Sequence, residues 1–459
     1  MAKVIPLLLF FLFFFSLATA LSSDGEALLS LLSAASPSAK SSSSVLSSWN
    51  PSLQTPCSWH GIECSPQNRV ISLSLPNTFL NLSSIPPALS SLSSLQLLNL
   101  SSTNISGTIP PPFGQLTNLR LLDLSSNSLS GPIPKELSQL SALQFLCLNF
   151  NRLSGQIPPQ LANLTSLQVL WLQDNLLNGS IPSQLGSLVS LQQLRVGGNP
   201  NLTGEIPSQL GLLTNLTIFG AADTRVSGVI PPTFGNLSNL HTLALYYTEV
   251  SGSIPPEIGS CLELRNLYLP MNKLTGSIPP QLGKLQKLTS LLLWGNELSG
   301  QIPAELSNCS ALVELDLSSN NFTGEIPSEI GYLTSLTIIL DLSCNSFTGE
   351  LPGSFSSLTE LQSLDLSHNK LCGRIKVLSS LTSLTTLNIS YNNFSGPIPV
   401  TPFFVTISTN SYLENPNLCQ SIDGFTCSSR ATRKKGLKSA ALISIILASS
   451  VIFVSNIKG

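Results

Sequence analysis

The chain has 459 residues, a formal net charge of −2 and only 10% charged residues, while 42% of its residues are hydrophobic. So low a charge without a basic excess argues against nucleic acid as a partner. It suits a surface that is solvated by Ser, Thr, Asn and attached sugar.

The first 20 residues indicate export. Lys3 precedes an apolar run, Val4–Leu17, and the small residues Ala18-Thr-Ala20 follow as a cleavage site. A membrane anchor is the alternative, but the run is short for a span. We therefore predict a cleaved signal peptide over residues 1–20 and entry into the secretory pathway.

Residues 21–69 are predicted to form an N-terminal cap. Ser23-Asp-Gly-Glu26 has the pattern of a capping box, which would open a helix through Leu32. The serines at 41–44 form a flexible linker. Cys57 and Cys64 are close enough in an exported chain to predict a disulfide.

Residues 70–399 repeat one unit. Leu119–Asn127 has the form L-x-x-L-x-L-x-x-N, and Ser128–Pro134 follows with a G-x-I-P type ending. The unit returns every 23 to 25 residues and defines 14 turns of a leucine-rich repeat. The last position of this pattern, the slot position, is filled by Asn or Thr in every turn. These residues are Thr78, Thr103, Asn127, Asn151, Asn175, Asn199, Thr224, Thr248, Asn272, Asn296, Asn320, Asn345, Asn369 and Asn392.

This unit predicts an α/β solenoid. The leucines of L-x-L alternate with polar residues, so they point inward from a short strand. No turn can bury its leucines alone, and the turns must stack. The slot Asn would satisfy backbone groups where the strand bends away, and Thr would do part of this. We expect parallel strands on the concave face and short helical turns on the convex face.

The chain has nine cysteines. In an exported protein, the cysteines that flank the repeats are predicted to pair as Cys57–Cys64 and Cys419–Cys427. Cys261 and Cys309 replace core residues and should be buried, whereas Cys147, Cys344 and Cys372 fall at outward positions. An odd total leaves at least one thiol unpaired, and no cysteine or histidine cluster indicates a metal site.

Acceptor sequences for N-glycosylation are frequent. A repeat rich in Asn, Leu and Ser produces some of them by chance, but in an exported chain many are expected to carry sugar. They lie at Asn81, Asn99, Asn104, Asn163, Asn178, Asn201, Asn215, Asn236, Asn308, Asn321, Asn388 and Asn393.

The outward residues of the strands change character along the array. At the ends they are polar, as in Asp123, Ser125 and Ser126, but over seven central turns aromatic residues, glycines and single charges replace them. Exposed aromatics in a concave patch predict a binding site, although some could simply pack on each other. The predicted site residues are Phe150, Trp171, Asp174, Arg195, Gly197, Gly198, Asp223, Tyr246, Tyr247, Tyr268 and Trp294.

Arg195-Val-Gly-Gly198 is the sharpest motif of this patch. Arg195 should project from the strand, and the two glycines should leave a hollow with exposed backbone N–H groups beside it. A guanidinium above such a hollow suits a planar or tetrahedral anion. The alternative is that the glycines only relax a turn that is one residue longer than its neighbours.

The cap, the L-x-G-x-I-P repeats and the Cys419/Cys427 end resemble plant leucine-rich-repeat receptor-like kinases. More narrowly, Trp171–Asn175, Arg195-Val-Gly-Gly198 and Leu245–Thr248 resemble receptors for root meristem growth factor peptides. The resemblance implies a plant-type superhelix without a cofactor. It also implies a secreted peptide hormone, whose sulfated tyrosine Arg195, Gly197 and Gly198 would hold, and a co-receptor kinase with a leucine-rich-repeat ectodomain.

The C-terminal part follows a different pattern. We predict a Cys-pair cap and a basic juxtamembrane segment over 400–436, a short transmembrane segment over 437–455 and a tail over 456–459. The apolar run Ala440–Val454 is short, since about 20 residues are usual for a span. A lipid-anchor signal is the alternative.

No kinase motif occurs in the sequence, so we expect no enzymatic activity. The favoured function is a cell-surface protein at the plasma membrane that binds a peptide hormone without a kinase of its own. Two alternatives stay open. One is a secreted inhibitor or decoy, and the other is a truncated ectodomain of a receptor serine/threonine kinase.

Overall fold

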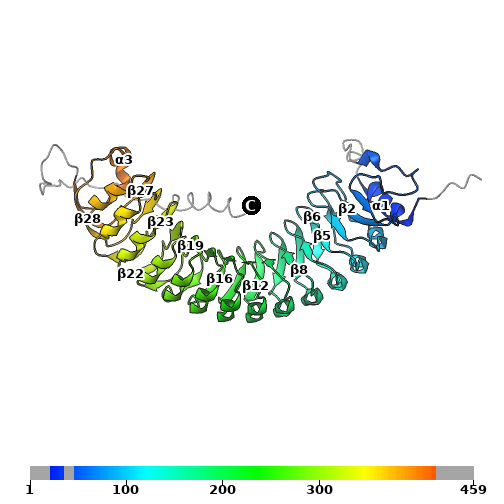
Figure 1. The fold of residues 1–459 in the computed structure, drawn as a ribbon, viewed down its shortest axis with the longest axis horizontal. Coiled ribbons are helices and arrows are strands. Elements are labelled where there is room, and N and C mark those ends of the chain that lie inside the picture. Colours follow the sequence, from blue (N-terminus) through cyan, green and yellow to red (C-terminus); the bar gives the residue numbers. More distant parts are fainter. Residues whose placement is uncertain (1–20, 36–45, 420–459) are drawn as a thin grey trace, which may run out of the picture.

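The computed structural model describes residues 21–35 and 46–419, which form one continuous arc of stacked turns (Figure 1). The predicted signal peptide, the 41–44 linker, Cys427 and the predicted transmembrane segment lie outside the described residues. Within the described residues, no helix is long and apolar enough to cross a bilayer.

A 15-stranded sheet lines the concave face. Its first strand, β1, is antiparallel to β2 and belongs to the cap, and every later pair is parallel and in register. The strands are β1 Ile62–Cys64, β2 Val70–Ser74, β3 Leu97–Asn99, β5 Leu121–Asp123, β7 Phe145–Cys147, β9 Val169–Trp171, β11 Gln193–Arg195, β13 Ile218–Gly220, β15 Thr242–Ala244, β17 Asn266–Tyr268, β19 Ser290–Leu292, β21 Glu314–Asp316, β23 Ile339–Asp341, β25 Ser363–Asp365 and β27 Thr386–Asn388.

Short 3-10 helices form the convex face, where the sequence predicted short helical turns. Each begins one residue after the proline or isoleucine that precedes it, and its leucine, isoleucine or phenylalanine is buried in the core. They are η2 Pro87–Ser91, η3 Pro111–Gln115, η4 Lys135–Gln139, η5 Pro159–Asn163, η6 Ser183–Ser187, η7 Ser208–Leu212, η8 Pro232–Asn236, η9 Pro256–Ser260, η10 Pro280–Lys284, η11 Ala304–Asn308, η12 Ser328–Tyr332, η13 Gly353–Ser357 and η14 Lys376–Ser380.

The G-x-I-P segments form further parallel strands on one flank of the arc. With β29 of the C-terminal cap, they pair into an eight-stranded sheet and two three-stranded sheets, which the sequence analysis did not predict. These strands are β4 Ser106–Gly107, β6 Ser128–Pro132, β8 Arg152–Gln156, β10 Leu176–Gly179, β12 Asn201–Glu205, β14 Arg225–Val229, β16 Glu249–Gly252, β18 Lys273–Leu274, β20 Ser299–Gly300, β22 Asn321–Glu325, β24 Ser346–Thr348, β26 Cys372–Arg374, β28 Asn393–Pro397 and β29 Asn417–Cys419.

The slot residues form the predicted hydrogen-bonded ladder. Asn175 donates through Nδ2 to the carbonyls of Leu148 and Leu172, at 3.0 and 3.1 Å, and its Oδ1 accepts the Leu153 N–H at 2.9 Å. Thr103 keeps only part of this pattern, because its hydroxyl donates to the Leu100 carbonyl at 2.6 Å. Each Asn therefore ties its own turn to the turn before it.

The residue just before the slot adopts a left-handed backbone in turn after turn. Phe150, Tyr247 and Met271 have φ of 53°, 52° and 53°, a region that bulky residues rarely enter. Gly198, with φ of 63°, occupies the same place. The bend at the end of each strand thus fixes this conformation whatever the side chain is.

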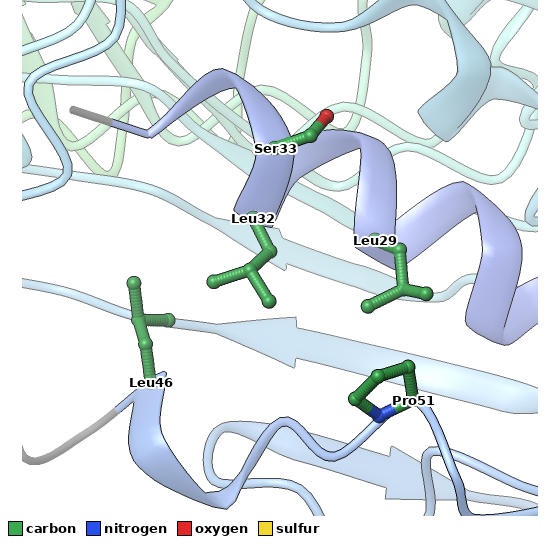
Figure 2. Close-up of a pocket in the computed structure, with 5 residues that line it drawn as sticks. All are labelled: Leu29, Leu32, Ser33, Leu46 and Pro51. Carbon is green, nitrogen blue, oxygen red and sulfur yellow. The ribbon is translucent and has the colours of Figure 1, made fainter. Parts of the chain in front are cut away.

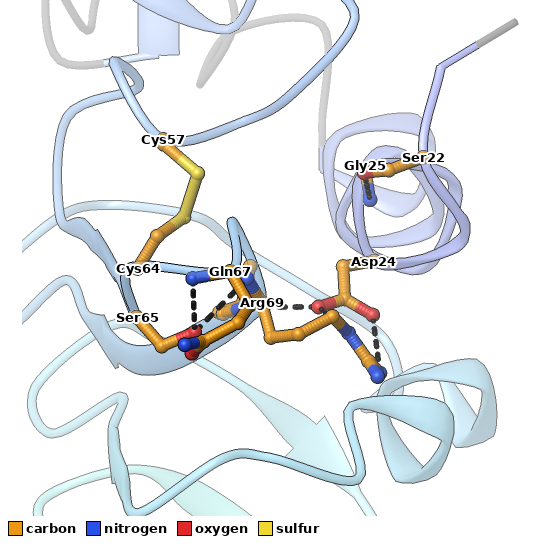
Figure 3. Close-up of a disulfide and its surroundings, with 9 residues drawn as sticks. Ser22, Asp24, Gly25, Cys57, Cys64, Ser65, Gln67 and Arg69 are labelled. Atoms are coloured by element: carbon orange, nitrogen blue, oxygen red, sulfur yellow. Dashed lines mark hydrogen bonds and ion pairs between the residues drawn. A yellow bond between two sulfur atoms is a disulfide. The ribbon is translucent and has the colours of Figure 1, made fainter.

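The cap helix α1, Ser23–Ala34, begins one residue earlier than predicted. Its N-cap is Ser22, whose hydroxyl accepts the Gly25 N–H at 3.2 Å, so the Ser23–Glu26 capping box was a wrong prediction. Asp24, in the first turn of this helix, contacts the start of the repeats instead. Its carboxylate accepts two hydrogen bonds from Arg69, each 3.0 Å, and the Val70 N–H at 2.8 Å (Figure 3).

The disulfide Cys57–Cys64 closes this cap, as predicted. Trp49 and Trp59 of the same cap stack with ring centroids 5.2 Å apart. A pocket of about 450 Å³ remains between α1 and the segment that starts with η1, Leu46–Ser48 (Figure 2). Its lining residues Leu29, Leu32, Ser33, Leu46 and Pro51 all belong to the cap, so it is separate from the concave centre.

The C-terminal cap extends the ladder by one rung that the sequence analysis missed. Asn415 donates to the Ile389 carbonyl at 2.8 Å and accepts the Phe394 N–H at 2.9 Å, as a slot Asn does. Its turn has no concave strand but the helices α3, Pro402–Thr406, and η15, Thr409–Tyr412. Cys419 is disulfide-bonded, and its predicted partner Cys427 lies outside the described residues.

Candidate ligand-binding surface

The last residue of each concave strand forms a column that runs along the inner wall of the arc. Parallel pairing places Arg195 beside Trp171 on one side and Gly220 on the other. In chain order, the column reads Asn99, Asp123, Cys147, Trp171, Arg195, Gly220, Ala244, Tyr268, Leu292, Asp316, Asp341, Asp365 and Asn388.

At both ends of the array, the side chains of this column accept hydrogen bonds from backbone N–H groups of their own turns. The carboxylate of Asp123 accepts the Ser125 N–H at 3.0 Å, and that of Asp316 accepts the Ser318 N–H at 2.9 Å. Asn99, Asp341, Asp365 and Asn388 make the equivalent bond. The polar ends are therefore structural caps, which explains their uniform composition.

The seven central turns, Cys147 to Leu292 in the column, lack these caps. Within the described residues, no hydrogen bond is donated by the N–H of Asn149, Gln173, Gly197, Ala222, Tyr246 or Trp294, which hold the place of the capped serines. Two amide oxygens, Asn149 Oδ1 and Gln173 Oε1, are also buried without a partner. The central turns thus leave backbone N–H groups and amide oxygens without the hydrogen bonds that the end turns make. Because buried polar groups are normally hydrogen-bonded, we take these central turns as the candidate site.

Arg195 lies on the concave face, at the end of β11, and is half-buried. Its guanidinium carbon lies 5.3 Å from the centroid of the Trp171 ring, and Trp171 is held in turn by a 3.1 Å hydrogen bond to Gln193. Among the described residues, the ion pairs involve Arg69, Lys273 and Lys287 but not Arg195. Burial lowers the pKa of Arg195, so the site holds a partly desolvated cation that takes part in none of these ion pairs.

The tyrosines lie beyond Arg195 along the wall. Tyr247 packs edge-to-face on Tyr246 and on Trp294, with centroids 6.1 and 6.0 Å apart. Burial first, and then the Asp223 and Asp174 carboxylates, raise the pKa of Tyr246 to about 12. Burial also raises the pKa of Tyr268. Some of the aromatics therefore do pack on each other, while all of them stay partly exposed.

The prediction of a hollow at Gly197 and Gly198 is wrong. A Cβ at Gly197 would lie 2.7 Å from the Ala222 carbonyl oxygen, and one at Gly198 would lie 2.5 Å from Asp174 Oδ1. Of the two N–H groups, that of Gly198 donates to the Ala222 carbonyl at 2.8 Å, whereas that of Gly197 donates no hydrogen bond within the described residues. These glycines allow the close approach of the next turn and of the Asp174 carboxylate.

The remaining predicted residues share the same face, in the turns around Arg195. Phe150 is 41% exposed, and Asp174 and Asp223 occupy the left-handed position on either side of Gly198. The sequence analysis did not single out Gln193, which positions Trp171, or Gly220, which lies beside Arg195. A glycine inside the strand pattern Ile218-Phe-Gly220 was the available signal.

The other cysteine and sequon predictions have mixed outcomes. Cys261 and Cys309 are fully buried, as predicted, but Cys147 is only 7% exposed although its position faces outward. Ten of the twelve sequon asparagines are exposed, whereas Asn99 and Asn388 are half-buried and cap the backbone, so glycosylation stays a prediction.

A row of three carboxylates follows the site. Asp316, Asp341 and Asp365 lie on consecutive strands in register. Burial raises the pKa of Asp316 to about 6, and burial together with both neighbouring carboxylates raises the pKa of Asp341 well above its usual range. Burial also raises the pKa of Asp365, against hydrogen bonds from Ser367 and Asn388.

These shifts predict a protein that is more stable in mild acid. The folded carboxylates hold protons that the unfolded chain, with a pKa of about 3.9, releases. The contribution to stability is thus complete below about pH 4 and is lost as the pH rises through about 6. The midpoint of thermal unfolding should be higher at pH 5 than at pH 7, and Asp341→Asn should raise it at pH 7.

Asp123→Asn is the matched control for this prediction. Asp123 makes the same cap but lies between the uncharged Asn99 and Cys147. Its replacement should leave the difference between the unfolding midpoints at pH 5 and pH 7 unchanged. If Asp341→Asn does not reduce this difference in unfolding midpoint, the row of three carboxylates is not its cause.

Comparisons with protein families identify the repeats. A leucine rich repeat N-terminal domain matches residues 21–65. Leucine rich repeat models match 93–153, 166–188, 263–285, 287–309, 322–371 and 334–394.

Plant receptors are among the similar proteins. The LRR receptor-like serine/threonine-protein kinase RGI5 of Arabidopsis thaliana is 63% identical over 105 residues, which are 21% of this chain and 9% of the relative. The LRR ectodomain of the receptor kinase GASSHO1/SCHENGEN3 of the same plant was solved with CASPARIAN STRIP INTEGRITY FACTOR 2. It is 38% identical, with a TM-score of 0.66, over 74% of this chain and 43% of that one.

A second solved structure is the plant peptide hormone receptor RGFR1 in complex with RGF2. It is 37% identical, with a TM-score of 0.55, and the match covers 76% of this chain and 65% of that one. The chain thus spans less than half of the length of the first two relatives and just under two thirds of the third.

Proposed function

Because the chain belongs to the leucine-rich repeat family of plant receptor-like kinase ectodomains, we propose that it binds a tyrosine-sulfated peptide hormone on its concave face. It would do so at the surface of the cell, with the seven uncapped turns as the binding surface. A co-receptor kinase with a leucine-rich-repeat ectodomain is its proposed second partner.

The observation that carries this proposal is the state of Arg195. Its guanidinium stacks on Trp171, is half-buried, and has no carboxylate partner among the ion pairs of the described chain. A partly desolvated charge without a counter-ion is costly, and a bound anion would remove that cost. A sulfate ester supplies one charge and several acceptor oxygens, which suit the fork of N–H donors.

The surroundings favour a peptide over a small ion. Half-buried aromatic rings extend along the wall from Trp171 to Trp294 on both sides of Arg195, and rings of this kind are typical anchors at binding interfaces. The uncapped N–H groups of the same turns offer donors to the backbone of an extended chain. RGFR1, which is similar in fold and sequence, is a peptide hormone receptor in complex with RGF2.

Calorimetry with synthetic RGF2 tests the proposal. The full chain, secreted from eukaryotic cells, should bind the tyrosine-sulfated peptide at least about tenfold more tightly than the unsulfated one, because one charge-assisted contact contributes at least about 1.4 kcal/mol. Equal affinity for the two forms would remove the sulfate from the proposal. Absence of binding to both would overturn the choice of this hormone class.

A further inference from the structure

The 3-10 helices of the convex face approach one another at their fourth residue. In seven of them this residue is a glycine, and a Cβ there would lie only 2.2–2.6 Å from the carbonyl oxygen of the second residue of the next helix. None of these glycines has a positive φ, so the close approach of the next helix is what leaves no room for a side chain. They are Gly114, Gly186, Gly211, Gly235, Gly259, Gly283 and Gly331.

Five of the seven glycines follow one another in consecutive helices, from Gly186 in η6 to Gly283 in η10. Their contacts join η6 through η11, which follow the concave strands β9 through β19 in the chain. At both ends of this glycine run the fourth residue is larger, namely Ala162 in η5 and Ser307 in η11. The run therefore lies on the outer rim of the arc, behind the central strands that carry the candidate surface (Figure 1).

Two buried thiols tie the same helices together. Cys261, the residue after η9, donates through Sγ to the Phe234 carbonyl of η8 at 3.2 Å. Cys309, the residue after η11, donates in the same way to the Leu282 carbonyl of η10 at 3.3 Å. Two of the five contacts of the glycine run thus have a second link, which leucine, the residue at this place in most other turns, does not offer.

The spacing of the helices sets the angle between neighbouring turns. On the concave side, backbone hydrogen bonds hold the strands ~4.8 Å apart, so a wider spacing on the convex side bends the wall more strongly. Where the fourth residue is serine or alanine, its Cβ has to fit, and the next helix must lie farther away than it does after a glycine. The glycine run therefore favours a flatter wall than the larger residues on either side of it.

We propose that the glycine run on the convex face keeps the wall of strands β9 to β19 flat, so that an extended chain can contact all six strands at once. The five glycines are positioning residues, because they lie behind the wall and act through the direction of its strands. The inference rests on the proposed function and deepens it, since a flat wall about 24 Å long selects an extended peptide over a compact ligand.

The expected movement can be calculated from the contacts of Gly235 and Gly259. A Cβ at these residues would lie 2.6 and 2.2 Å from the next helix, so the helices have to separate by about 0.4 and 0.8 Å to reach 3.0 Å. With about 10 Å between packed layers, the two separations together turn the wall by about 7°. The end of the wall two strands away then moves by about 1 Å, which exceeds the range of distances that a hydrogen bond tolerates.

Two ligands of different length test the inference on the full chain. The double variant Gly235→Ala/Gly259→Ala should weaken the binding of tyrosine-sulfated RGF2 at least about tenfold in calorimetry, because anchors at the two ends of the wall no longer fit together. It should bind N-acetyl-O-sulfotyrosine methylamide within about twofold of wild type in saturation-transfer NMR. This small probe has one anchor and does not span the wall. An equal loss for both ligands would mean that the glycines only stabilise the fold, and wild-type affinity for the peptide would also overturn the inference.

Gly114→Ala/Gly331→Ala is the matched control. A Cβ at either residue would lie 2.4 Å from the nearest atom of the next turn, so the collisions are similar. These contacts, η3 with η4 and η12 with η13, lie outside the seven uncapped turns. The control should lower the unfolding midpoint as much as the first variant does and leave both affinities unchanged. If the first variant unfolds at a lower temperature than the control, Gly235→Ala alone, with the smaller overlap, should give an intermediate loss of peptide affinity.

The outcome can be separated from that of the proposed function. The angle between the turns of β13 and β17, measured in crystal structures of wild type and of Gly235→Ala/Gly259→Ala, does not depend on any ligand and should increase by about 7°. If wild type does not bind RGF2 but the angle increases, the choice of hormone fails and the role of the glycines in shaping the wall stands. If wild type binds RGF2 and the angle is unchanged, the hormone class stands and the inference is overturned.

Discussion

Replacement of Arg195 by alanine should weaken the binding of a tyrosine-sulfated peptide by about tenfold to a hundredfold and leave the unsulfated form nearly unaffected. Hydrogen bonds to a charged group contribute about 1.5–3 kcal/mol, and each 1.4 kcal/mol is a factor of ten in affinity. Arg195 is half-buried, so solvent screens the contact less than it would at an exposed site. Calorimetry with both peptide forms measures the two changes.

The controls for this prediction separate charge from shape. Arg225→Ala removes an exposed arginine from the start of the flanking strand β14 and should change neither affinity. Arg195→Lys keeps the charge but loses the planar fork, so an intermediate loss is expected. Trp171 should keep its hydrogen bond to Gln193 in both Arg195 variants, because neither substitution changes either partner. An equal loss for the sulfated and unsulfated forms would mean that Arg195 does not bind the sulfate.

Replacement of Asn199 by leucine should reduce the free energy of unfolding by about 3–5 kcal/mol. Asn199 is fully buried, and its Nδ2 donates to the carbonyls of Leu172, Val196 and Gly197 at 3.1, 2.8 and 3.1 Å. Its Oδ1 accepts the Leu177 N–H at 3.0 Å. A leucine would leave these buried backbone groups unpaired, at about 1–3 kcal/mol for each group that water cannot reach.

Thr224→Val is the control from the next turn. The Thr224 hydroxyl donates to Ala221 and accepts the Val226 N–H at 3.3 Å, so its loss should cost about 1 kcal/mol. Urea denaturation followed by circular dichroism gives both values, and hydrogen exchange shows whether the loss begins near Asn199. Similar losses for the two variants would mean that the amide ladder contributes no more than a single hydroxyl.

Asn199 also connects stability with the binding surface. Two of its hydrogen bonds end on Val196 and Gly197, the residues that follow Arg195. A variant at this position should therefore lose peptide affinity as well, although its side chain lies in the core. The effect on binding would be indirect, through the direction in which Arg195 leaves the strand.

The period of the sequence predicted the strands because each leucine has the same neighbours in every turn. The Thr slots and the core cysteines Cys261 and Cys309 followed from the same alignment and lie as expected. Features outside the repeats, such as the N-cap of α1, were harder to predict. Ser22 and Ser23 are both common N-cap residues, so the sequence alone did not show that Ser22 caps the helix or that Asp24 pairs with Arg69, 45 residues away.

The candidate site was predicted in outline but not in detail. The seven turns that lack the terminal Asp or Asn stood out in the sequence, and the structure shows that they also lack its hydrogen bond. The structural role of each glycine could not be predicted, because it depends on atoms in the neighbouring turn. Gly197 makes room for Ala222, Gly198 for Asp174, and Gly220 for no residue of the chain.

The spacing of the concave strands limits how a peptide can align with this wall. Neighbouring turns repeat every ~4.8 Å, whereas an extended peptide advances ~3.4 Å per residue, so about seven ligand residues have the length of five turns. Side chains of a bound peptide then cannot meet successive turns one to one. A hormone with two anchor residues would bind only if the right number of turns separates their two subsites. Insertion or deletion of one repeat between the subsites would therefore abolish recognition, although every contact residue would still be present in the sequence.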